Sequence, residues 1–198
     1  MRGFFFLELN SPSNDFHRCS QLDAIQPQGV RNTCLGWASW SNFVSDENYE
    51  IKGYTSTYFA ARMLNVEWLQ HRAGVHQMFP SSTDITDSAG NALVTSYAVR
   101  RPDGTWSLML VNRDSGQAHT VRVVFSDAKT KRTASFSGPI TSVSWGSEQY
   151  VWINDGPNSH PDPDHPPVAT LLTGSPSTFT LPKASITVLR GRVAGLKD

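Results

Sequence analysis

The feature of the sequence that most constrains the fold is a hairpin signal, LVTSYAVRRPDGTWSLMLVNRD, at residues 93–114. Apolar and polar residues alternate on both sides of Pro102-Asp103-Gly104, which is the pattern of two half-buried strands. Proline presets the first torsion of a turn, aspartate bonds its own backbone, and glycine accepts positive φ. The stretch therefore predicts two antiparallel strands around a tight turn.

Short strands separated by turns continue through the rest of the chain. Several strands at this spacing indicate an antiparallel β-sandwich, which we assign to residues 75–198. The proline-rich loop at 155–167 is excluded from it, because proline cannot join a ladder. The predicted strands are 75–80, 93–101, 105–112, 119–125, 131–136, 140–145, 149–153 and 178–193.

The first 74 residues follow a different order. Residues 3–9 are an apolar run interrupted only by Glu8, as in a strand buried on both faces. A long irregular loop follows at 10–36, and apolar residues at three- and four-residue steps then predict an amphipathic helix over about 53–70. The predicted protein is thus mainly β, an antiparallel β-sandwich preceded by one residual β/α unit at residues 1–74.

The balance of charges argues against two classes of partner. The 198 residues carry 17 basic and 17 acidic side chains, so no broad field favours nucleic acid or an anionic membrane. No apolar run approaches the length of a membrane span. No glycine-rich phosphate loop, Gly-x-Ser-x-Gly elbow or basic patch occurs. We expect neither nucleic acid nor a membrane as partner, and neither nucleotide chemistry nor serine hydrolysis.

Three stretches resemble the C-terminal part of bacterial glycoside hydrolases with a catalytic TIM barrel, relatives of families 39 and 30. They are YEIKGYTSTYFAARMLNVEWLQ, VTSYAVRRPDGTWSLMLVNRD and the closing LPKASITVLRG. In such enzymes the last barrel strand and helix lead into a β-sandwich packed on the side of the barrel. The resemblance covers nearly the whole chain but is poor over residues 1–35. It implies the accessory region of a carbohydrate-active protein whose parent enzymes are secreted or periplasmic.

The same resemblance bears on catalysis. In these enzymes the acid/base glutamate follows the fourth barrel strand and the nucleophile the seventh, so both precede Met1 if residues 4–9 match the eighth. Glycosidases need two carboxylates, about 5 Å apart in retaining enzymes and further apart in inverting ones. The candidates within the sequence are Glu8, Asp15 and Glu47, and the alternative role for Glu8 is an ion pair with a nearby arginine such as Arg2 or Arg18. A non-catalytic tail with at most weak polysaccharide binding and a small stand-alone glycosidase both remain open.

Aromatic residues are the candidates for carbohydrate binding, because a flat ring matches the apolar C–H face of a pyranose. Trp37 and Trp40 flank the long loop, where the resembling enzymes often stack an aromatic ring on the sugar. Trp145, Tyr150 and Trp152 lie in predicted strands and form a platform if they project from one face. The alternative is core packing, which is the commoner fate of strand tryptophans.

A short acidic loop, HPDPDH at residues 160–165, is the candidate metal site. The carboxylates of Asp162 and Asp164 suit Ca²⁺, whereas the two histidines suit a transition metal. The spacing matches no zinc motif, and a purely structural loop is the other interpretation. We expect no cofactor other than such a structural Ca²⁺.

The two cysteines leave the redox compartment open. Cys19 and Cys34 enclose a short loop. A disulfide between them fits a secreted protein, and two reduced thiols fit a cytoplasmic one equally well.

The predicted helix and the first strand carry more apolar surface than the sandwich can cover. Phe59, Met63 and Val66 lie on the helix, and residues 4–6 are three consecutive phenylalanines. Each large apolar side chain left in water forfeits about 1.5–3 kcal/mol of burial, and monomers rarely expose large patches. We therefore expect a homo-oligomer formed through residues 1–74.

Overall fold

The computed structural model describes residues 43–45, 51–155, 160–161 and 166–195 of the chain. Two compact units divide it: Met1–Tyr58 with Trp152–Pro163, and Phe59–Val151 with Asp164–Asp198. The strand predicted at 3–9 and the loop at 10–36 lie outside the described residues, and the division at residue 74 stays a prediction.

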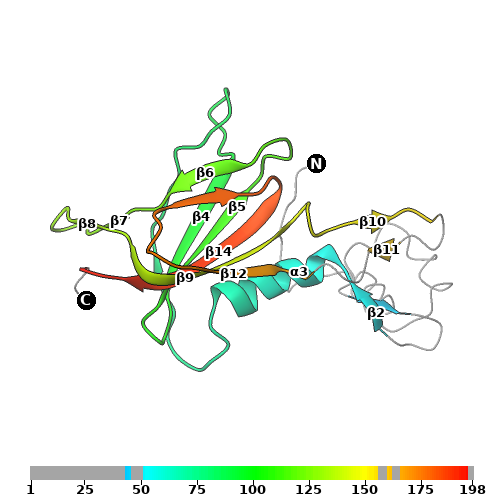
Figure 1. Ribbon diagram of the computed structural model, residues 1–198, viewed down its shortest axis with the longest axis horizontal. Helices are drawn as coiled ribbons and strands as arrows, with labels where there is room; N and C mark the ends of the chain where they lie inside the picture. The colour runs from blue at the N-terminus through cyan, green and yellow to red at the C-terminus, as the bar shows by residue number, and fades with distance from the viewer. Residues whose placement is uncertain (1–42, 46–50, 156–159, 162–165, 196–198) are drawn as a thin grey trace, which may run out of the picture. The chain divides into compact units, whose positions relative to one another are not determined.

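The protein is mainly β, as the sequence predicts. The first unit contributes two short antiparallel pairs to the described residues, β1 with β2 and β10 with β11. The second unit contains the large sheet and most of the helical stretch (Figure 1). In chain order the elements are β1 (Phe43–Ser45), β2 (Ile51–Tyr54), α3 (Ser56–Arg62), η3 (Met63–Trp68), β3 (Gln77–Phe79), β4 (Val94–Arg100), β5 (Trp106–Asn112), β6 (His119–Arg122), β7 (Phe125–Ser126), β8 (Thr133–Ala134), β9 (Phe136–Gly146), β10 (Trp152–Ile153), β11 (His160–Pro161), β12 (Val168–Leu172), β13 (Thr178–Leu181) and β14 (Ser185–Val193).

The second unit is built on a six-stranded antiparallel sheet with the order β12-β9-β14-β5-β4-β3. The predicted hairpin is confirmed, because β4 pairs with β5 up to Arg100 opposite Trp106. Its turn closes with the Arg101 amide donating to the Thr105 carbonyl at 2.8 Å, and Gly104 takes a φ of +79°. The Asp103 carboxylate accepts a hydrogen bond from the Thr105 amide at 2.9 Å, so the turn forms by the chemistry that its sequence indicates.

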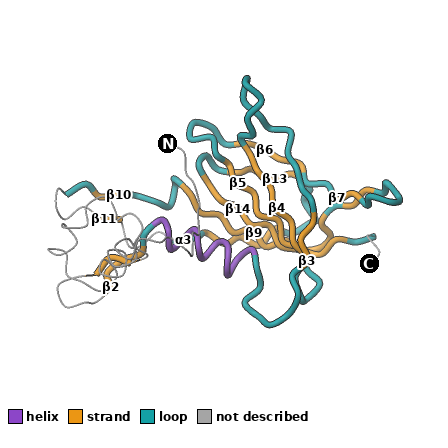
Figure 2. Tube along the Cα trace, turned by 180° about the vertical axis from the view of Figure 1, so that it is seen from behind, coloured by secondary structure: helices purple, strands orange, loops and turns teal. Residues whose placement is uncertain are grey.

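A second layer covers one face of this sheet. β6 pairs with β13, and the pair lies over the large sheet in both views (Figures 1 and 2). The space between the layers is filled by aliphatic and aromatic side chains that form one core cluster. Its buried members are Val94, Ala98, Leu108, Leu110, Val121, Val123, Phe125, Phe136, Ile140, Phe179, Leu181 and Leu189.

The other face of the sheet carries the helical stretch. Side chains alternate along a strand, so Val188 faces away from the core cluster that contains Leu189. On this side η3 packs against β14 and β5. The α3 helix continues into η3, where the Leu69 amide donates to the Leu64 carbonyl at 3.0 Å, a π-helical bond. The amphipathic helix expected at 53–70 is confirmed over most of its length.

Two strand predictions need correction. The single strand expected at 178–193 is two, β13 and β14, because the chain turns at residues 182–184, where Ala184 has a positive φ of 42°. The edge strand β12 was not predicted, since most of its residues are exposed and it shows no alternation of burial. No helix among the described residues is long and apolar enough to span a membrane.

Candidate functional site

Most of the predicted site residues lie outside the part of the chain that the structure describes. The structure therefore neither brings together nor separates the candidate catalytic carboxylates and the candidate Ca²⁺ ligands, and their roles stay predictions. The residues concerned are Glu8, Asp15, Cys19, Cys34, Trp37, Trp40, Glu47, Asp162 and Asp164. In the described ranges, no group of three or more His, Cys, Asp and Glu residues is arranged to hold a metal ion.

Two of the predicted sugar-binding aromatics, Trp145 and Tyr150, lie at the end of β9 and just after it. Trp145 is 8% exposed, and its ring stacks on Phe59 with the centroids 5.3 Å apart. Tyr150 meets Trp145 edge to face at 5.8 Å. Trp145 thus occupies a core position, which was the alternative for strand tryptophans. The sugar platform that includes Trp152, whose side chain is not described, stays a prediction.

Glu67 is the buried acidic residue among those described. It lies in η3, and its Oε2 is 3.1 Å from Nη1 of Arg190 on β14. Its Oε1 is 3.8 Å from Nε of Arg62, at the end of α3. The carboxylate is therefore the shared counter-ion of two arginines, and the Arg190 contact links the helical stretch to the sheet.

A third arginine, Arg101, satisfies the backbone at the end of η3. Its Nε donates to the Trp68 carbonyl at 3.1 Å, and its Nη2 donates to the carbonyls of Glu67, at 2.7 Å, and Leu69. The last carbonyls of a helix have no partner within it, and a cation there also matches the helix dipole. Arg101, at the start of the hairpin turn, therefore caps the helical stretch from the sheet.

The charges around this cap act on the pKa of Arg101 in opposite directions. Burial lowers the pKa of the Arg101 guanidinium, and the positive charge of Arg190 lowers it further. The carboxylates of Asp103 and Glu67 act in the opposite direction. Two arginines are thus held near each other at the end of η3.

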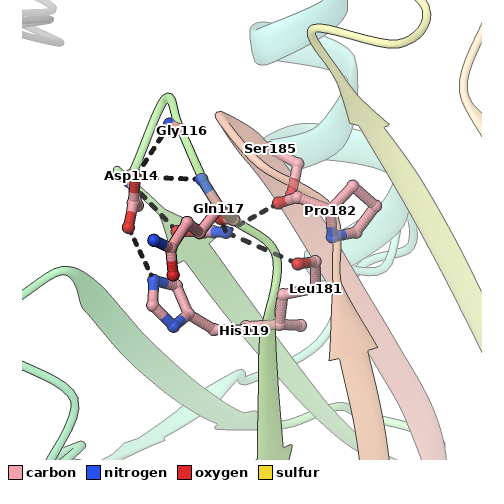
Figure 3. Close-up of polar contacts among 8 residues, drawn as sticks. Asp114, Gly116, Gln117, His119, Leu181, Pro182 and Ser185 are labelled. Atoms are coloured by element: carbon pink, nitrogen blue, oxygen red, sulfur yellow. Dashed lines mark hydrogen bonds and ion pairs between the residues drawn. The ribbon is translucent and has the colours of Figure 1, made fainter.

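A second polar cluster joins the end of β5 to the turn before β14 (Figure 3). Asn112 is buried, and its Nδ2 donates to the carbonyls of Gln117 at 3.0 Å and Pro182 at 2.8 Å. Its Oδ1 accepts the Asp114 amide at 3.0 Å. One side chain therefore holds two loops that are far apart in the sequence.

Asp114 organises the loop in this cluster. Its Oδ1 accepts the amide of Gly116 at 2.8 Å, and its Oδ2 lies 3.0 Å from Nε2 of His119. The Gly116 amide, followed by the His119 side chain, lowers the pKa of the Asp114 carboxyl. The nearby Ser185 donates its hydroxyl to the Pro182 carbonyl at 2.6 Å. A nucleophilic triad requires the serine to bond the histidine, so this arrangement is a structural corner.

Four described carboxyl groups have a lowered pKa, which is the opposite of the raised pKa that apolar surroundings give a glycosidase acid. Each carboxyl group with a shifted pKa is shifted down by hydrogen bonds within a turn. The main donors are the Asn91 side chain to Asp87, the Gly116 amide to Asp114 and the Thr130 amide to Asp127. At Asp103, burial raises the pKa, but the hydrogen bonds from the Thr105 hydroxyl and amide outweigh it and the pKa is lowered.

Sequence reasoning missed both polar clusters, although one signal was present. Glu67 lies on an amphipathic helix beside Trp68 and four residues after Met63, both of which are buried. In the same way, Arg101 lies two residues after Val99, which is buried, and residues two apart in a strand point to the same face. Charged residues are rare at positions that the period of a helix or strand places on its buried face, unless they are paired. Each of these two positions therefore indicates a partner.

No family model matches the sequence, and no curated protein matches it. Solved structures of glycoside hydrolases do match, at low identity and partial coverage. A GH30 endoxylanase from Clostridium papyrosolvens C71 has a TM-score of 0.43 and 14% identity, over 89% of this chain and 38% of that one. A GH51 arabinofuranosidase from Xanthomonas axonopodis pv. citri has a TM-score of 0.34 and 18% identity, over 58% and 21%. CelM2, a bifunctional glucanase-xylanase from a metagenome library, has a TM-score of 0.33 and 16% identity, over 52% and 16%. The matches thus span 16% to 38% of the length of these proteins.

Proposed function

We propose that the chain is the non-catalytic β-sandwich region of a carbohydrate-active protein, of the kind that follows the barrel in glycoside hydrolases of families 39 and 30. Its own contribution is at most weak polysaccharide binding. Two of the stretches that carry the sequence resemblance support this, because they are neighbours in the sheet: β14 pairs with β5 from Ser185 opposite Asn112 to Gly191 opposite Trp106. The third stretch ends in η3, which packs on these same two strands.

The observation that carries the non-catalytic part of the proposal is the position of Glu67. A glycosidase acid works from an apolar pocket and needs a second carboxylate at a defined distance. Glu67 instead lies 3.1 Å from Arg190 and 3.8 Å from Arg62. The buried carboxylate of the described chain is therefore used as a counter-ion that holds the helical stretch in place.

The test combines hydrolysis and binding on the purified full chain. We expect no turnover of aryl glycosides and a small retardation in gels that contain xylan, cellulose or mannan. Hydrolysis that survives re-purification and disappears in Glu8→Gln would overturn the non-catalytic proposal in favour of a stand-alone glycosidase. Unchanged mobility in all three gels would remove polysaccharide binding from the proposal.

Self-association through residues 1–74 is part of the same proposal. Val66, on η3, is 46% exposed, so an apolar side chain of the helical stretch is left open to a partner. We expect light scattering to give a dimer or larger assembly at micromolar concentration, and Val66→Lys to weaken it. A monomer at the same concentration would contradict this part of the proposal.

A further inference from the structure

A shallow groove of about 590 Å³ lies at one end of the large sheet, within the second unit. It is formed where the β4–β5 turn, the start of β9 and the end of β14 meet. Arg101, Arg190 and Arg192 line it, together with a single carboxylate, that of Asp103. The remaining lining is uncharged and includes the hydroxyl-bearing side chain of Thr141.

The groove exists because the ladder between β9 and β14 is interrupted there. Arg190 lies opposite Thr141 and Arg192 lies opposite Ser137, so residues 138–140 stand against Gly191 alone. A bulge interrupts the ladder and bends the strand, and bulges are common beside binding sites. Here the bulge places Gly138 and Pro139 in the lining next to the three arginines, and the Gly138 amide donates to the Ser175 hydroxyl at 2.8 Å.

The arginines keep free donors at the groove. Within the described part of the chain, Arg101 uses Nε and Nη2 for the carbonyls of η3, and Arg190 uses Nη1 for Glu67. Arg192 is exposed, and no described residue forms an ion pair with it. The Nη1 of Arg101, the remaining nitrogens of Arg190 and the whole guanidinium of Arg192 are left for a ligand.

The charges of the groove favour an anion. Three arginines and one carboxylate, that of Asp103, line the groove, which leaves two positive charges, and Glu67 beside Arg190 is balanced by Arg62 outside the lining. Arg101 and Arg190 also repel each other, which contributes to the lowered pKa of Arg101. A bound carboxylate would neutralise part of the excess charge and weaken the repulsion.

We propose that this groove binds the carboxylate of a uronic acid residue in an acidic polysaccharide. Guanidinium groups bind carboxylates through parallel N–H donors, and the negative carboxylate of a uronic acid matches the excess positive charge of the groove. The open shape admits a polymer that runs across the surface, and the Thr141 side chain places a hydroxyl group in the lining, where it can bond a sugar hydroxyl. The polysaccharide identity of the ligand rests on the proposed carbohydrate function, whereas the oxyanion site rests on the arginines alone.

The experiment is affinity electrophoresis of the full chain in gels that contain polygalacturonate or its fully methyl-esterified form. These polymers share a backbone and differ in the charge of the carboxyl group. We expect retardation only by polygalacturonate, reduced by salt because exposed charges are screened. Arg192→Ala should weaken binding about tenfold, as expected for the loss of one charge-assisted hydrogen bond.

Arg122→Ala is the matched control, because it removes the same charge from an exposed residue of β6 that does not line the groove. Equal retardation in the two gels, or equal effects of the two substitutions, would overturn the groove as the site. Competition as strong from inorganic phosphate as from equimolar galacturonate would overturn the sugar assignment and leave a general oxyanion site. Failure in xylan, cellulose and mannan gels leaves this result unaffected, so the two proposals fail separately.

Discussion

The two faces of the six-stranded sheet are covered in different ways. The face under β6 and β13 is held by apolar side chains, among them Phe136, whose ring meets those of Phe125 at 5.0 Å and Phe179 at 6.2 Å. The face under η3 combines apolar contacts with the cluster of Glu67 and its arginines. Apolar burial does not depend on any partner's charge, whereas removing one member of a buried ion cluster leaves the others uncompensated. The first face should therefore be robust to changes of charge and the second sensitive to them.

The largest loss of stability is expected from a substitution on the apolar face. Phe136→Ala removes a ring that is 3% exposed and should lower the free energy of unfolding by about 3–5 kcal/mol. Urea denaturation measures it, with Val124→Ala as the control, because Val124 is 50% exposed and its truncation should cost less than about 0.5 kcal/mol. Equal losses from the two substitutions would mean that this layer is not the core of the domain.

A smaller loss is expected from the charged face. Arg101→Met keeps the length of the side chain but leaves the carbonyls of Glu67, Trp68 and Leu69 without their donor, which should cost about 2–3 kcal/mol. Arg101→Lys should recover only part of this, because one ammonium cannot reproduce the planar fork. A loss from Arg101→Met no larger than that from Arg122→Met would show that the cap does not stabilise the fold.

The sequence predicted those elements that residues close together in the chain determine. The hairpin at 93–114 contains the residues that form its turn, and the amphipathic helix shows apolar residues at helical spacing. The strand β12 was missed because an edge strand has no buried face to produce an alternating pattern, and the turn at 182–184 was missed inside a stretch that looks continuous in hydropathy.

The charged cluster lay beyond sequence reasoning for a different reason. Arg190 meets Glu67 across 123 positions of the sequence, and Arg101 meets it across 34. A charged residue on the predicted buried face of a helix or strand indicates that a partner exists. Which residue is the partner depends on the tertiary arrangement. The groove has the same origin, because the bulge that opens it arises from the pairing of β9 with β14.

The smallest change in stability is expected from a change in pH. The pKa of Asp114 is lowered from its ordinary value of 3.8 in the folded state, chiefly by the Gly116 amide. Its stabilising contribution is therefore present above that value and is lost as the pH falls below about 4. Urea midpoints measured across this range should fall less steeply for Asp114→Asn than for the wild type. Phe136→Ala should run parallel to the wild type, and a change in its slope would contradict the assignment of pH dependence to the turns.

The most direct test of the difference between the two faces is hydrogen exchange in Glu67→Gln. The substitution keeps the shape of the side chain but removes the charge that Arg190 and Arg62 share. The amides of η3 should exchange faster than in the wild type, while those of β6 and β13 keep their protection. Unchanged exchange in η3, or equal acceleration on both faces, would contradict the account that Glu67 serves to hold the helical stretch on the sheet.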